Sequence, residues 1–174
     1  MHFCEKPGAT KKLMRFTRGN MQGLSRAPET KEEAQMIYLQ LREYEKLLEH
    51  ALQCLPEEAC GLIGGSQDDL GNSYIEKVYP LENTDHSEEH FSLDPGGQLA
   101  AVKEMRANGW KPLGNWHSHP ASPSRPSEED IRLAYDSSAL YLILSLMERG
   151  APVLNAFRIE GGHVEKKEIR YIQG

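Results

Sequence analysis

One change in hydrophobic period limits the folds that this chain can form. Ile37, Leu39 and Leu41 occupy alternate positions, as the buried face of a β-strand does. Between Tyr44 and Leu55 the apolar residues instead recur every three or four positions, which is typical of one face of a helix. A strand therefore leads directly into an amphipathic helix, and both elements need a sheet against which to bury their apolar faces.

The rest of the chain is richer in strands than in helices. Strands are predicted over residues 59–65, 74–81, 91–93, 111–117, 140–147, 153–159 and 164–172, and helices over residues 97–108 and 127–135. The last two strands form a hairpin about Gly161-Gly162, and the helix over 97–108 has Leu99, Val102 and Met105 on one face. Because the strands cluster instead of alternating with helices, the pattern favours an α+β fold over a doubly wound parallel sheet.

Composition excludes several classes of function. The chain has 174 residues and a net charge of −6. Residues 1–26 hold six Lys or Arg against Glu5, a charge of +5, so the remaining residues sum to −11. An acidic body repels phosphates, which argues against a nucleic-acid partner. No apolar run approaches the roughly 18 residues of a membrane span, so no membrane partner is expected.

The three cysteines and the first residues indicate the compartment and the domain boundary. Three cysteines without a CxxC pair do not make a disulfide framework, so a reducing cytoplasm is expected. Residues 1–35 show no helical or strand period, and we interpret them as a flexible basic N-terminal extension before a domain at residues 36–174. Met36 precedes the first patterned segment and is a candidate for the true start.

The segment His117-Ser118-His119-Pro120 carries the strongest chemical signal. On a strand, side chains two residues apart leave the same face about 6.6 Å apart, so both imidazoles can reach one metal ion. Asp130 follows in the first turn of the next predicted helix, after a turn whose three prolines limit how far the two segments can separate. Two imidazoles, one carboxylate and a water make a four-coordinate zinc site with an open position, as hydrolytic zinc centres need.

A zinc hydrolase also needs a carboxylate that transfers protons without binding the metal. Glu57 and Glu58 are both candidates, and sequence spacing alone does not separate them. Ser127-x-x-Asp130 is in addition a helix-capping pattern, and capping and metal binding can coexist. His86 and His90 lie in an acidic loop that either binds a metal loosely or is simply solvated.

These residues resemble the JAMM (MPN+) metalloprotease family in its compact prokaryotic form. Glu58-Ala59-Cys60-Gly61 and the later His117, His119, Ser127 and Asp130 match its signature, a Glu followed at a distance by H-x-H-x(7)-S-x-x-D. The similarity extends over residues 37–172. It implies the cytidine-deaminase-like MPN fold, a curved and mostly antiparallel sheet flanked by helices.

The resemblance also implies a role for each residue of the signature. His117, His119 and Asp130 would bind Zn²⁺. Glu58, preferred to Glu57 because it precedes Gly61 by three positions, would activate a zinc-bound water as general acid and base. Ser127 would hydrogen-bond the oxyanion of the tetrahedral intermediate.

The implied substrate is a bond after the C-terminal Gly-Gly of a ubiquitin-like or sulfur-carrier protein. The tight spacings leave little room for the insertions that grip ubiquitin in other members, so the chain resembles the compact peptidases and isopeptidases. The alternative is a non-catalytic MPN-fold interaction module, although such modules typically lose zinc ligands. A zinc deaminase of nucleobases would need H-x-E with P-C-x-x-C, and the chain has no CxxC. The oligomeric state is left open.

Overall fold

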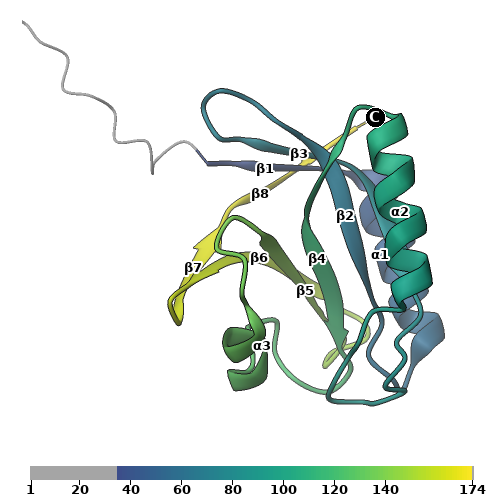
Figure 1. Cartoon of the computed structure of the whole chain (residues 1–174). Helices are drawn as coiled ribbons and strands as arrows, with labels where there is room; N and C mark the ends of the chain where they lie inside the picture. Colours follow the sequence, from purple (N-terminus) through teal and green to yellow (C-terminus); the bar gives the residue numbers. More distant parts are fainter. Residues whose placement is uncertain (1–34, 174) are drawn as a thin grey trace, which may run out of the picture.

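A computed structural model describes residues 35–173 as eight strands and three helices (Figure 1). The predicted extension over residues 1–35 falls, apart from Gln35, outside the described residues. The strands are β1 (Ile37–Gln40), β2 (Cys60–Gln67), β3 (Ser73–Leu81), β4 (Lys111–His119), β5 (Leu140–Ser145), β6 (Val153–Glu160), β7 (His163–Lys167) and β8 (Ile169–Ile172). The helices are α1 (Leu41–Cys54), α2 (Pro95–Ala107) and α3 (Glu128–Leu133). None of the three helices in residues 35–173 has the length and hydropathy of a membrane span.

All eight strands belong to one curved sheet, in the order β7-β6-β5-β4-β2-β3-β1-β8. Four of the seven pairings are antiparallel, and β1–β3, β1–β8 and β4–β5 are parallel. The edge strands β7 and β8 are separated in sequence by Glu168 alone, so the sheet must curl until its two edges nearly meet. The expected α+β fold with a curved, mostly antiparallel sheet is confirmed.

The main core lies on the inner face of the sheet, where α1 covers it. Leu47 and Ala51 of α1 pack into a buried cluster that takes residues from β1 to β6 and includes the fully buried Trp116. Full burial of a side chain such as Leu47 contributes about 1.5–3 kcal/mol, which is why the amphipathic pattern of this helix predicted its position.

The outer face carries two smaller hydrophobic clusters, one under each remaining helix. Met105 and Ala101 of α2 pack against Tyr79, with Leu62 partly buried beside them. A second cluster lies at β5 and β6, where Ile131 of α3 contacts it. Figure 1 shows α2 and α3 on opposite sides of β4.

Two sequence expectations about strands are wrong. Residues 91–93 form no strand, and only an isolated bridge pairs Leu93 with Asn83. The Asn83 side chain interrupts a regular ladder here, because its oxygen accepts the N–H groups of Asp85 and Ser92. The predicted strand 164–172 is divided at Glu168 into β7 and β8, since each half pairs with a different edge of the sheet.

The predicted apolar face of α2 is only partly correct. Met105 is buried and Val102 is half-buried, but Leu99 is exposed, and Ala101 is the other buried residue. The helix approaches β2 closely enough that a Cβ at Gly64 would lie 2.8 Å from Met105 Cγ. Such close packing suits the small Ala101 and the flexible Met105, which make the interface with β2 in place of Leu99.

Gly114 tests the close approach of β4 and β5. A Cβ at this position would lie 1.9 Å from the Leu140 carbonyl oxygen, and the residue has a φ of +152°. Gly114→Ala is therefore expected to lower the free energy of unfolding by about 3 kcal/mol, measured by denaturant unfolding. Gly150→Ala is the control, because its added Cβ meets none of the described atoms within 4 Å. Equal stability of the two variants would contradict the close strand pairing.

Candidate functional site

The two histidines of the motif lie at the end of β4, on the outer face of the sheet. Both are buried, with 1% of His117 and 5% of His119 exposed. Their Nε2 atoms are 3.0 Å apart, so the two rings converge as the i, i+2 spacing predicted.

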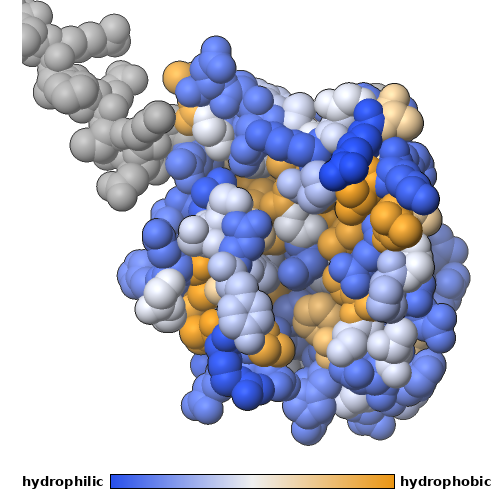
Figure 2. Space-filling model, viewed as in Figure 1, coloured by the Kyte–Doolittle hydropathy of each residue, from blue (hydrophilic) through white to orange (hydrophobic). Residues whose placement is uncertain are grey.

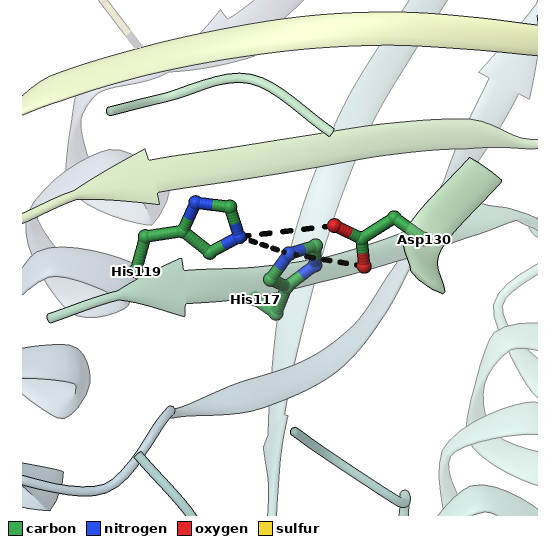
Figure 3. A group of neighbouring side chains, drawn as sticks. All are labelled: His117, His119 and Asp130. Carbon is green, nitrogen blue, oxygen red and sulfur yellow. Dashed lines mark hydrogen bonds and ion pairs between the residues drawn. The ribbon is translucent and has the colours of Figure 1, made fainter. Parts of the chain in front are cut away.

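Asp130 completes the cluster from the first turn of α3. Its Oδ1 lies 3.5 Å from Nε2 of His117, and its Oδ2 lies 3.8 Å from Nε2 of His119 (Figure 3). One ligand atom from each residue falls within 4.8 Å of the others. Within residues 35–173 this is the only group of three such side chains found close enough to hold a metal ion.

A capping box orients the Asp130 carboxylate. Ser127 is the N-cap of α3, and its Oγ accepts the Asp130 N–H at 3.0 Å. Asp130 Oδ2 in turn accepts the Ser127 N–H and hydroxyl, both at 2.7 Å. The cap therefore fixes the carboxylate beside the histidines, and helix capping is compatible with metal binding at this residue.

The turn between the histidines and α3 is anchored to the sheet by hydrogen bonds. Ser124 Oγ donates to the Ile143 carbonyl at 2.7 Å, and Asn155 Nδ2 donates to the Ser124 carbonyl at 2.9 Å. Ser145 Oγ donates to the Ser122 carbonyl at 2.6 Å. The prolines alone suggested a stiff turn, but these side chains determine where it lies.

The ring nitrogens and charges suit a metal that prefers nitrogen and oxygen ligands. His119 Nδ1 is 2.9 Å from the Pro123 carbonyl, so the proton sits on Nδ1 and the lone pair of Nε2 faces the cluster. Burial lowers the pKa of His117 and keeps its imidazole neutral. Burial alone would raise the pKa of Asp130, but the two imidazoles beside it and the Ser127 hydroxyl outweigh this effect and hold the carboxyl ionised. Two imidazoles and a carboxylate are a donor set that zinc accepts.

Glu58 lies beside this cluster because β2 and β4 are paired. The antiparallel register sets Cys60 opposite His117, so continuing it by two residues brings Glu58 opposite His119. Glu58 is 5% exposed, and its Oε1 lies 4.0 Å from Nε2 of His119. Burial raises its pKa to about 8, and the nearby Asp130 charge acts in the same direction while His119 opposes it. Glu57, the other candidate, is half-buried outside the cluster, and its Oε2 lies 3.3 Å from His86 Nδ1.

Three further residues of the site gave no signal in the sequence analysis. Ser118, on the opposite face from the histidines, accepts the Ala59 N–H at 2.8 Å and so holds the start of β2. Asn83 Nδ2 donates to the Glu58 carbonyl at 3.0 Å. Phe91 stacks on the His117 ring, with the centroids 4.6 Å apart, in the segment that was predicted to be a strand.

A cleft of about 970 Å³ opens above the cluster. Figure 2 shows a hollow over β4 between α2 and α3, with hydrophobic surface inside and mostly hydrophilic residues around it. The cleft is lined by Glu58, His119, Ser127 and Asp130, by Phe91, Asn115 and Tyr141, and by the carboxylates Asp85, Glu88, Glu89, Glu128 and Glu129. His86 and His90 are exposed and contact glutamates, and neither belongs to the His–Asp cluster.

Comparison with known proteins identifies the family. Residues 41–160 match the family described as prokaryotic homologues of the JAB domain. The chain belongs to this family. The JAMM (MPN+) resemblance of the sequence is therefore confirmed.

Several relatives cover most of the chain. It is 29% identical over 127 residues to the "CysO-cysteine peptidase" of Mycobacterium tuberculosis, which spans 73% of this chain and 85% of that protein. It is 32% identical over 100 residues to the "Probable TtuB-protein conjugate cleaving protease" of Thermus thermophilus, which spans 57% of this chain and 64% of the relative. A solution structure of a protein from Desulfitobacterium hafniense shares 53% identity and a TM-score of 0.74, covering 80% of this chain and 94% of that one.

Glu58 is expected to make the metal-free protein less stable as the pH rises. A carboxyl with a pKa of 4.5 when unfolded and about 8 when folded contributes its stability below the lower value and loses it as the pH rises through the upper one. When the pH is raised from about 5 to about 8.5, the melting temperature of wild type should therefore drop by a few degrees relative to that of Glu58→Gln. Thermal unfolding in a chelator measures this difference. A difference that does not change with pH would show that Glu58 titrates normally.

Proposed function

We propose that this chain is a zinc-dependent peptidase or isopeptidase that hydrolyses a bond after the C-terminal Gly-Gly of a ubiquitin-like or sulfur-carrier protein. The observation that supports it is the convergence of His117, His119 and Asp130 beside a buried Glu58 in one cleft. The names of two relatives support the substrate class, because they describe a peptidase for CysO-cysteine and a protease for TtuB conjugates.

In this proposal His117, His119 and Asp130 hold the zinc ion. When bound, zinc supplies a Lewis acid and lowers the pKa of water, which provides a nucleophile at neutral pH. The N–H of His119 that faces Pro123 and the capping box around Asp130 fix two of the three ligands, and such supporting contacts raise metal affinity.

Glu58 is the proton carrier of the proposed reaction. Its carboxylate accepts a proton from the attacking water and returns it to the leaving amine. Burial favours this role because a carboxyl whose pKa lies near neutral pH can both take up and release a proton. Asn83 and Ser118 hydrogen-bond the C=O and the N–H of the Glu58–Ala59 peptide group and so fix the backbone that carries the Glu58 side chain.

Ser127 is the proposed donor to the oxyanion. It lines the cleft at the start of α3, and its hydroxyl hydrogen is directed at Asp130. The hydroxyl rotates about one bond, so in the reaction it can turn from this carboxylate to the developing negative charge.

A non-catalytic interaction module is the alternative, and the site disfavours it. A module that only binds a partner has no need for a buried carboxyl with a raised pKa beside two converging imidazoles. Such a group costs stability, and a fold that gained nothing from it would be more stable with an apolar residue there.

The direct test is cleavage of a sulfur-carrier protein that has a short peptide added after its Gly-Gly. We expect the zinc-loaded wild type to release the intact carrier, as measured by mass spectrometry. Glu58→Gln should lose at least about a thousandfold in rate while keeping one zinc per chain, because it retains all three ligands. His119→Ala should lose both the activity and the zinc. Intact substrate after long incubation with the zinc-loaded wild type would overturn the proposed function.

A further inference from the structure

The outer face of β4 carries one polar side chain that the proposed chemistry does not use. Asn115 lies two residues before His117, so its side chain is on the same face as the two histidines. It lines the same cleft. Along the strand, its position is one step of about 6.6 Å from His117.

The neighbours of Asn115 in the sheet are apolar or already hydrogen-bonded. Leu62 of β2 is opposite Asn115 on one side, and Tyr141 of β5 is opposite on the other. Leu62 packs against the cluster under α2, and Tyr141 belongs to the cluster beside α3. The Tyr141 hydroxyl donates to the Asp136 carbonyl at 3.3 Å. The Asn115 amide is therefore a single polar group between two hydrophobic clusters.

The amide of Asn115 is also incompletely bonded. Its Oδ1 is buried and has no hydrogen-bond partner among the described residues. A buried polar atom without a partner destabilises the folded state, and a leucine of similar size would avoid this loss. An acceptor without a partner, on a side chain that lines the cleft next to the reacting groups, points to a ligand that donates to it when the amide turns toward the cleft.

We propose that the Asn115 amide binds the main chain of the substrate tail, about two residues from the bond that is cut. This inference rests on the proposed function. An extended tail that runs along β4 advances by the same distance per residue as the strand does. Its peptide N–H two residues from the scissile carbonyl therefore lies opposite Asn115, whose Oδ1 accepts it. To come within hydrogen-bond distance, the tail must bring its backbone down to the cleft floor. Glycine allows this approach best, because it has no side chain to hold the backbone away.

The test compares two near-isosteric variants in the zinc-loaded full chain. Asn115→Leu removes the acceptor, and Asn115→Asp keeps it. Calorimetry measures their affinity for a sulfur-carrier protein that ends in Gly-Gly, and the same carrier without its last four residues is the control ligand. We expect Asn115→Leu to weaken binding of the full carrier about five- to tenfold, with a smaller loss in Asn115→Asp. In cleavage assays the loss should appear in KM and not in kcat.

Two further measurements separate this role from a structural one. Asn115→Leu should keep one zinc per chain and melt at a temperature no lower than wild type, because it removes an unpartnered amide. The truncated carrier should bind wild type and Asn115→Leu equally. If wild type binds the tail without cleaving it and Asn115→Leu binds it more weakly, the inference stands and the proposed hydrolysis fails. Equal affinity of wild type and Asn115→Leu for the full carrier, or no dependence on the tail in wild type, would overturn the inference.

Discussion

The antiparallel pairing of β2 with β4 is the constraint on which the site depends. It brings Glu58 and His119 together although 60 residues separate them in the sequence, and hydrogen bonds between Ala59 and Ser118 fix the register where it matters. A slip by one residue would turn the histidines toward the α1 core and Trp116 toward the cleft. The bulge at Gly64 and the close approach of Gly114 to Leu140 further limit such slips.

The site concentrates polar groups that the rest of the fold must stabilise. Burial raises the pKa of Glu58, and neither His117 Nδ1 nor Asn115 Oδ1 has a hydrogen-bond partner within residues 35–173. These groups destabilise the folded chain unless a ligand or a metal completes them. The large cluster on the inner face, which joins residues of α1 to residues of six strands, supplies the compensating burial. Because the two clusters on the outer face are small and separate, the cleft forms between them.

The sequence predicted those parts of the structure that depend on local pattern. The change of period after Leu41 located β1 and α1, and the spacing of His117, His119 and Asp130 predicted their convergence. It did not separate Glu57 from Glu58 without the family resemblance, since strand register is a long-range property. The strand predicted over residues 91–93 and the unbroken strand predicted over residues 164–172 were wrong for the same reason. In each case a distant partner, Asn83 or the second sheet edge, decides where the backbone hydrogen bonds go.

The proposed hydrolysis depends on one zinc ion bound by His117, His119 and Asp130. The most direct measurement is an anomalous difference map at the zinc absorption edge, from crystals of the chain grown with one equivalent of zinc. A single strong peak is expected within bonding distance of both Nε2 atoms and of Asp130, with Glu58 nearby and not bonded to the metal. A map without a peak there, or with its peak at the exposed His86 and His90, would contradict it.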